Sequence, residues 1–418
     1  MAELAVLGNG LRVVLVPCEA QSVAFGLFVA SGSRHETDST AGISHFIEHM
    51  LFKGTEKRTP VEITRAIEGR GGNFNAWTSE ESTAYFTHMP FEYLDEAVDI
   101  ISDMYLNAKI AADDFARERE VILEEIKMYA DEPDAVAMEN LQRALFPRHR
   151  LGSPIAGSAE SLMPLKPRDM KEYIASHYRA DNTIAVIAGR FDAAKALRAV
   201  ERALSMLHSG EKGKTKKSQR ERFYPPVSEI SVSKDVQQAQ IALGYRTFGI
   251  GDARKYAASV FDAVMGRGMS SRLFQQVREK RGLSYDISSR MQFFSDAGIW
   301  SVTAGVAPSK VEKTLEVIDR ELVKICDRKV GAAELKRTKE FLTGNFRISH
   351  ERVQSKLFFY AQTMLSYGKI VSPEDQVEGI RAVSADDVQA VAAEIIDPAR
   401  RSLSTVVSKG TGGARCSY

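Results

Sequence analysis

The chain has 418 residues, 44% of them hydrophobic and 27% charged, which is typical of a globular protein large enough for more than one domain. Its 56 Lys and Arg residues nearly balance its 55 Asp and Glu residues, so no overall electrostatic field favours nucleic acid as a partner. The three cysteines, Cys18, Cys326 and Cys416, form no close-spaced pair. They therefore indicate reduced thiols in a cytosol rather than a disulfide framework.

The N-terminal stretch has neither the charge nor the length of a targeting segment. Glu3 stands where a signal peptide is basic, and the turn-forming pair Asn9-Gly10 interrupts the apolar residues. No run approaches the roughly 20 apolar residues of a membrane span. The sequence therefore predicts a protein that is neither exported nor anchored in a membrane.

Hydrophobic periodicity predicts a similar series of elements in the two halves of the chain. In the first half we expect a hairpin over 4–16, a strand over 23–30, a helix carrying ISHFIEHML, a strand over 82–88 and helices over 92–105 and 113–129. In the second half we expect strands within 229–245, a helix over 253–265, strands within 286–306 and helices over 310–326 and 332–348.

The hydrophilic, basic stretch 209–226 ends in Pro225-Pro226 and is typical of an exposed linker. It divides the chain into domains over 1–208 and 227–418.

An ungapped shift of 220 residues pairs several similar residues of the two halves, which indicates a weak internal duplication. The fold class predicted is α+β: two homologous domains, each a mostly antiparallel sheet covered by helices. The 220-residue shift aligns His45, Glu48 and His49 with Met265, Gly268 and Met269, and it aligns Glu125 with Asn345. Only the first half therefore has ionisable groups at these positions.

The segment ISHFIEHML places two histidines and a carboxylate in an otherwise apolar helix. At about 100° per residue, His45 and His49 lie one turn apart and Glu48 lies on the neighbouring ridge. Two imidazoles in this arrangement can bind one ion, and a catalytic zinc needs three protein ligands with one position left for water. The alternative is a pair of core or surface histidines beside a solvated Glu48.

The third ligand must come from another element, and the helix predicted at 113–129 is rich in acids. It offers four carboxylates, Glu118, Glu120, Glu124 and Glu125. Glu118 and Glu125 are seven residues apart and therefore share a face, but spacing alone does not choose among the four. We expect Val121 and Ile122 to anchor this helix against the core.

Five ordered segments carry a resemblance to a known family. They are GISHFIEHMLFKGT at 42–55, GGNFNAWTSEESTAYF at 71–86, EREVILEEI at 118–126, LGSPIAG at 151–157 and SSRLFQQVREKRGLSYDISS at 270–289. The sequence resembles the pitrilysin or insulinase family of zinc metallopeptidases, which carry the inverted HxxEH motif. It is most similar to the branch that contains mitochondrial processing peptidase and its bacterial relatives.

The resemblance implies a role for each residue of the predicted site. His45, His49 and Glu125 would be the ligands of one zinc ion per chain, and Glu48 would be the general base of peptide hydrolysis. Glu118 would hold a ligand in its orientation. Residues 1–208 would be the zinc-binding catalytic domain, and 227–418 an inactive homologous domain.

The resemblance also implies that the second domain supplies an Arg/Tyr pair to the active site. Tyr285 would donate a hydrogen bond to the developing oxyanion, and Arg278 would hold a backbone carbonyl of the substrate. The alternative is that Tyr285 begins a strand and Arg278 forms a surface ion pair.

Substrate would bind in extended form along a sheet edge, a mode in which backbone hydrogen bonds supply much of the affinity. The matching edge is Phe74-Asn75-Ala76-Trp77-Thr78, and its predicted substrate-binding residues are Phe74, Asn75, Ala76 and Trp77. A core role explains Trp77 slightly better than contact with a substrate.

The quaternary structure implied by the family is a homodimer. In relatives of this length the Arg/Tyr pair comes from a partner subunit, and this chain carries both parts, so we expect an active site completed in trans within a closed chamber that admits peptides and unfolded segments. The alternatives are a catalytic subunit that needs a different partner chain, a non-catalytic scaffold and a metal-dependent peptide-binding protein. The expected location is the bacterial cytoplasm, or an organelle if the chain is a matured form.

Overall fold

The computed structural model describes residues 2–210 and 224–408, which form two compact units. The first unit comprises residues 2–126, 153–210 and 348–371, and the second comprises 127–152, 224–347 and 372–408. Most of the predicted linker at 209–226, and the whole of the segment around Cys416, lie outside the described residues.

A six-stranded sheet forms the centre of the first unit, with the strand order β1-β2-β6-β3-β5-β4. Neighbouring strands are antiparallel, except that β2 and β6 are parallel. The strands are β1 (Glu3–Val6), β2 (Arg12–Pro17), β3 (Ser22–Val29), β4 (Asn73–Thr78), β5 (Thr83–Pro90) and β6 (Thr183–Gly189). The predicted hairpin is confirmed, because β1 pairs with β2 across Asn9-Gly10.

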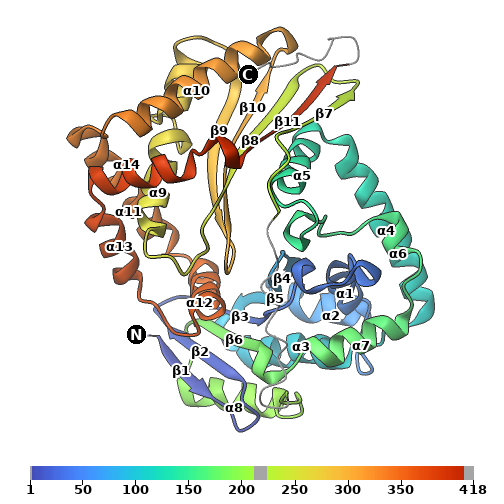
Figure 1. Cartoon of the computed structure of the whole chain (residues 1–418). Helices are drawn as coiled ribbons and strands as arrows, with labels where there is room; N and C mark the ends of the chain where they lie inside the picture. The colour runs from blue at the N-terminus through green and yellow to red at the C-terminus, as the bar shows by residue number, and fades with distance from the viewer. Residues whose placement is uncertain (1, 211–223, 409–418) are drawn as a thin grey trace. The chain divides into compact units, whose positions relative to one another are not determined.

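Apolar side chains on both faces of this sheet build two separate cores. Successive residues of a strand point to opposite faces, so Phe25 and Leu27 of β3 belong to one core while Ala24 and Phe28 belong to the other. The first core is covered by helices of the N-terminal half and the second by α12 (Val353–Tyr367), which lies across β3 and β6 (Figure 1). The helices of the first core are α1 (Ile43–Leu51), α2 (Pro60–Glu68), α3 (Leu94–Asn107), α4 (Ala112–Asp131), α6 (Ala159–Leu162), α7 (Pro167–His177) and α8 (Ala193–Leu204).

The second unit contains a five-stranded sheet with the strand order β7-β11-β8-β10-β9. Its strands are β7 (Glu229–Lys234), β8 (Ala239–Thr247), β9 (Ser284–Phe293), β10 (Gly298–Val306) and β11 (Arg401–Ser408). One face is covered by α5 (Pro133–Leu145). The helices associated with the other core are α9 (Lys255–Gly266), α10 (Val311–Asp327), α11 (Ala332–Ser349), α13 (Pro373–Ala382) and α14 (Ala385–Ile395).

The two sheets repeat one topology, which confirms the predicted α+β architecture of two homologous parts. The order β2-β6-β3-β5-β4 corresponds strand for strand to β7-β11-β8-β10-β9, and the single parallel pair falls at the same place in each. The strands β6 and β11 were not predicted from the sequence. Each is inserted between two strands that come much earlier in its half of the chain.

The ungapped register of the duplication is only partly right. α11 begins 220 residues after α4, as the predicted shift requires. However, α9 begins at Lys255 rather than at position 263 and ends at Gly266, so Gly268 and Met269 do not lie on the counterpart of α1. The segments that connect the matching elements therefore differ in length between the two halves, although α4 and α11 keep the predicted spacing.

Each half of the chain contributes one helix to the other unit. α5 follows α4 in sequence but belongs to the second unit, and α12 follows α11 but belongs to the first. Leu141 of α5 and Leu357 of α12 are both fully buried. Within residues 2–210 and 224–408, no helix is both long and apolar enough to cross a membrane.

Candidate metal centre

The helix α1 carries His45, Glu48 and His49, and its start is held by a buried carboxylate. Glu36 accepts hydrogen bonds from the backbone N–H groups of Gly42 (2.7 Å) and Ser44 (2.9 Å), donors that would otherwise be unsatisfied at a helix N-terminus. Gly42 has a φ of 89° and its Cα lies so close to Ala156 that an added Cβ would be 2.6 Å from the Ala156 carbonyl oxygen. The beginning of α1 is therefore fixed in place.

The helix α4 lies beside α1 and supplies Glu118 and Glu125. The rings of Phe46 and Phe115 stack with centroids 4.6 Å apart, and Ile122 is completely buried. The prediction that Val121 also anchors α4 is wrong, because this residue is 50% exposed. Ile122, one residue on, turns toward the core instead.

Three side chains converge in the manner of a metal site. One potential ligand atom from each of His45, His49 and Glu125 lies within 4.8 Å of the other two. Glu125 Oε2 is 3.8 Å from His45 Nε2 and 3.5 Å from His49 Nε2. The contact of α1 with α4 thus brings Glu125, rather than Glu124, to the two imidazoles.

The surroundings of both imidazoles suit metal binding. Glu118 Oε1 lies 3.0 Å from His49 Nδ1 and accepts its hydrogen, which leaves the Nε2 lone pair of His49 directed toward Glu125. Burial, and to a smaller extent His49, lowers the pKa of His45 to about 4, so this ring is neutral at neutral pH. His45 Nδ1 is buried and has no hydrogen-bond partner among the described residues.

The chemical types of the three donor atoms indicate which metal ion these residues fit. Two imidazole nitrogens and one carboxylate oxygen form a three-ligand set that zinc uses at catalytic sites. Magnesium and calcium prefer oxygen ligands alone. The side chains of His45, His49 and Glu125 therefore fit zinc.

Glu48 lies on α1 between the two histidines but outside the three-residue cluster. Its Oε2 accepts a hydrogen bond of 2.5 Å from the Thr78 hydroxyl at the end of β4. Burial raises the pKa of the Glu48 carboxyl, and the bond from Thr78 and the nearby His49 oppose that rise. One carboxylate oxygen is thereby held in place.

The predicted substrate-binding residues Phe74, Asn75, Ala76 and Trp77 lie on β4, which is the edge strand of its sheet. Phe74 packs against Phe52, just beyond α1, with ring centroids 5.4 Å apart. Trp77 points to the opposite face and packs near Phe28 at 6.4 Å, as part of the core under α12. The backbone N–H of Ala76 donates to the side chain of Asn75 at 2.8 Å.

Arg278 and Tyr285 lie together in the second unit. Arg278 is in a short π-helix (Phe274–Glu279), and its guanidinium lies 4.8 Å from the centre of the Tyr285 ring and 4.7 Å from that of Phe274. Tyr285, at the start of β9, is 78% exposed. Arg278 also lies 3.8 Å from the Glu279 carboxylate. The pair is formed within one unit and its phenol faces away from the core.

The sequence placed Thr78 on the predicted substrate edge but did not predict its contact with Glu48, and it did not identify Glu36 as part of this site. Thr78 had a recognisable signal, since it lies two residues after Ala76 in a strand and therefore shares its face. Glu36 had none, because its contact with the start of α1 depends on the path of the intervening loop.

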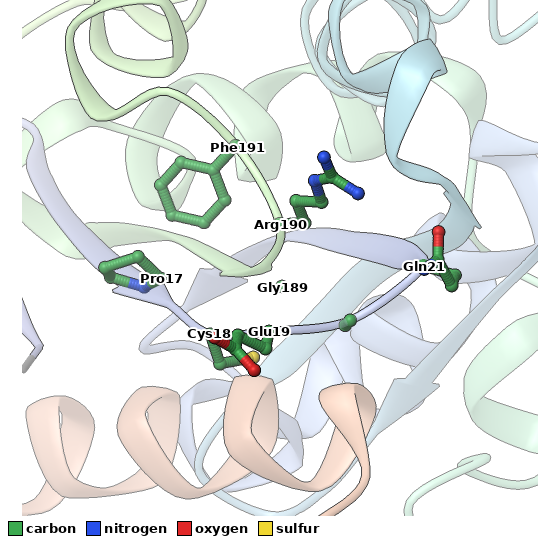
Figure 2. Close-up of a pocket in the computed structure, with 8 residues that line it drawn as sticks. Pro17, Cys18, Glu19, Gln21, Gly189, Arg190 and Phe191 are labelled. Atoms are coloured by element: carbon green, nitrogen blue, oxygen red, sulfur yellow. The ribbon is translucent and has the colours of Figure 1, made fainter.

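A cavity of about 620 Å³ lies elsewhere in the first unit, at the end of the sheet where β2 and β6 end and β3 begins (Figure 2). Its lining includes Cys18, Glu19, Arg190 and Phe191. None of the three clustered donors lines it, so this cavity and the metal centre are distinct features.

Comparisons with known proteins identify the family of the chain. Residues 12–159 match the family model described as insulinase (peptidase family M16), and residues 164–342 match the model described as the peptidase M16 inactive domain. An uncharacterized zinc protease of Bacillus subtilis is 31% identical over 93% of this chain and 94% of its own length. An uncharacterized zinc protease of Rickettsia felis is 34% identical over 91% of this chain and 92% of its own length.

Solved structures share the fold at lower identity. A protease from Helicobacter pylori has a TM-score of 0.89 at 21% identity, covering 97% of this chain and 99% of that one. A structure from Pseudomonas fluorescens, described as a peptidase M16 inactive domain, also has a TM-score of 0.89, at 18% identity and 98% coverage of both chains.

Removal of one imidazole should abolish stable zinc binding. In His49→Ala two of the three donors remain, and we expect the purified chain to lose its zinc on dialysis, whereas the wild type keeps about one ion per chain. The measurement is metal content by mass spectrometry. His88→Ala, at a histidine outside the cluster, is the control, and a His49→Ala chain that keeps its zinc would rule out this site.

Proposed function

Because the chain belongs to the insulinase family of peptidases, family M16, we propose that it is a zinc-dependent endopeptidase that hydrolyses peptides and unfolded segments. The observation that carries the proposal is the convergence of His45, His49 and Glu125, with ligand atoms within 4.8 Å of one another, beside the carboxylate of Glu48. The zinc proteases named among its relatives support the choice of ion.

In this proposal His45, His49 and Glu125 hold one zinc ion per chain. The bound ion supplies Lewis-acid chemistry, which polarises a carbonyl group and makes a water molecule acidic enough to attack at neutral pH. Glu118 keeps the His49 ring in the orientation and tautomer that present Nε2, through the 3.0 Å contact with Nδ1.

Glu48 acts as the general base. It takes a proton from the attacking water and passes it to the nitrogen of the leaving amine, so that the peptide bond is broken without an unstable anionic leaving group. Thr78 binds one of its oxygens, which leaves the other for the water. The raised pKa of Glu48 favours this role, because a stronger base accepts the proton more readily.

The substrate lies in extended form along β4, which is the edge of its sheet. Backbone groups of Phe74, Asn75, Ala76 and Trp77 pair with it, so recognition depends little on the substrate's sequence. The Asn75 side chain, which now occupies the Ala76 N–H, moves aside when a strand is added. The side chain of Trp77 contributes to the core rather than to binding.

Tyr285 and Arg278 complete the active site from a second copy of the chain. Tyr285 donates to the oxyanion and Arg278 holds a substrate carbonyl. The stacking of Arg278 on Tyr285 supports their action as one unit, and the exposure of Tyr285 leaves it accessible to a partner. The assembly is a homodimer with two sites in a closed chamber, located in the bacterial cytoplasm.

Glu48→Gln should separate catalysis from metal binding. The amide cannot accept the proton, so we expect cleavage of an unstructured fluorogenic peptide to fall at least about 100-fold while zinc content stays at the wild-type value. Glu120→Gln, the same substitution at an exposed position of α4, is the matched control. Wild-type turnover by Glu48→Gln would contradict the assignment, and an inactive, zinc-loaded, dimeric wild type would favour a missing partner or a scaffold.

Thr78→Val should lower kcat about tenfold, because a hydrogen bond to a charged group contributes about 1.5–3 kcal/mol and 1.4 kcal/mol corresponds to a tenfold change in rate. Thr78→Ser keeps the hydroxyl and should retain most activity. The readout is steady-state kinetics on the same peptide, with metal content checked for each variant. Thr64→Val, which removes an exposed hydroxyl from α2, is the control. A Thr78→Val enzyme with unchanged kcat would show that Thr78 does not orient Glu48.

Completion in trans can be tested with a mixed dimer of Glu48→Gln and Tyr285→Phe chains, purified through two different tags. Each variant alone should be inactive. If Tyr285 acts on its partner's zinc site, one of the two sites in the mixed dimer is intact and about half of the wild-type activity returns. No recovery in a confirmed mixed dimer would mean that Tyr285 acts within its own chain.

A further inference from the structure

A lysine next to α1 contacts the carboxylate that holds His49. Lys53 lies two residues after the last residue of α1, and its Nζ is 2.6 Å from Glu118 Oε2. The other oxygen of Glu118 is the one that lies 3.0 Å from His49 Nδ1. Each oxygen of this carboxylate therefore has one partner, and the chain of contacts runs from Lys53 through Glu118 to His49.

Burial makes the lysine important to Glu118. Only 8% of the Glu118 side chain is exposed, whereas 34% of the Lys53 side chain is. A buried carboxylate is costly unless a charge or several hydrogen bonds compensate it. In the described part of the chain, Lys53 is the only Lys or Arg side chain paired with Glu118, and the His49 ring contributes a single hydrogen bond.

Lys53 also fixes where the carboxylate lies. With Oε2 held by the ammonium group, the plane of the Glu118 carboxylate is constrained and Oε1 is kept toward His49. Removal of the lysine would leave Glu118 Oε2 without its charged partner, so that the contact of Oε1 with His49 would no longer be constrained from both oxygens. A surface ion pair contributes little to stability, but this pair has one buried member that touches a metal-site histidine.

We propose that Lys53 is a positioning residue of the metal centre: it holds Glu118 in the orientation that presents His49 Nε2, and so strengthens zinc binding. The inference rests on the proposed zinc site. It adds a residue that neither touches the ion nor takes part in proton transfer.

The test measures zinc affinity rather than turnover. The full-length chain is stripped of metal and titrated with zinc in competition with a chromophoric chelator. Loss of a partner of a metal-site histidine typically weakens metal binding 10- to 100-fold, so we expect Lys53→Met to raise the zinc dissociation constant about tenfold. Lys53→Arg keeps the charge and should restore most of the affinity. Lys57→Met, at an exposed lysine on the same loop, should have no effect.

A double-mutant cycle distinguishes action through Glu118 from a general effect of the substitution. In a Glu118→Gln chain the anion is gone, so adding Lys53→Met should change the zinc affinity no further. An equal loss in both backgrounds would overturn the proposal, as would unchanged affinity in Lys53→Met alone. Thermal unfolding of the metal-free chains checks that each variant is folded.

Peptide cleavage by the same samples separates this inference from the proposed function. If the wild type binds zinc and the double-mutant cycle gives the expected affinities, but no peptide is cleaved, the proposed peptidase activity is refuted and the role of Lys53 is retained. If the wild type cleaves peptides and Lys53→Met binds zinc as tightly as the wild type does, only the positioning role of Lys53 is refuted. A wild type that binds no zinc would overturn both.

Discussion

The packing of α1 against α4 is the interaction on which the candidate site depends. α1 has nine residues, too few to be a stable helix by itself in water. Its apolar side is buried, with Phe46 stacked on Phe115 of α4, and its first turn is held by Glu36. Only when the two helices are locked together do donors that are 80 residues apart in the chain reach one small volume.

The side chains around this contact form a series of partners that ends at the partly exposed Lys53. His45 and His49 face Glu125, Glu118 stands behind His49, and Lys53 stands behind Glu118 at the surface. Glu48 is held separately, from β4, by Thr78. These secondary contacts hold the His49 ring and one oxygen of Glu48 in fixed positions, as preorganised electrostatic catalysis by the proposed site would require.

The duplication places two different sets of side chains on one framework. Both sheets have one order of strands and both place a helix of the opposite half on one face. In the second copy α9, the counterpart of α1, carries no histidine, and Asn345 lies on α11 where α4 carries Glu125. A sheet and its covering helices need only apolar periodicity, so the fold does not require the clustered His45, His49 and Glu125. What the second copy carries instead is the exposed Tyr285 with Arg278 against its ring.

The spacing of residues within short segments of the sequence was enough to determine several features of this protein. Helical spacing alone puts His45 and His49 one turn apart, and alternating or continuous apolar runs predict β3, β5 and the long helices, because these depend on neighbours in sequence. The choice of Glu125 over Glu124 came from resemblance to a family and not from spacing. Tertiary structure decided what depends on distant contacts: the insertion of β6 and β11, the exchange of α5 and α12, the exposure of Val121, and the approach of Thr78 to Glu48 and of Lys53 to Glu118. A short sequence pattern carries no information on these, because each is set by how whole elements pack and not by the period within one of them.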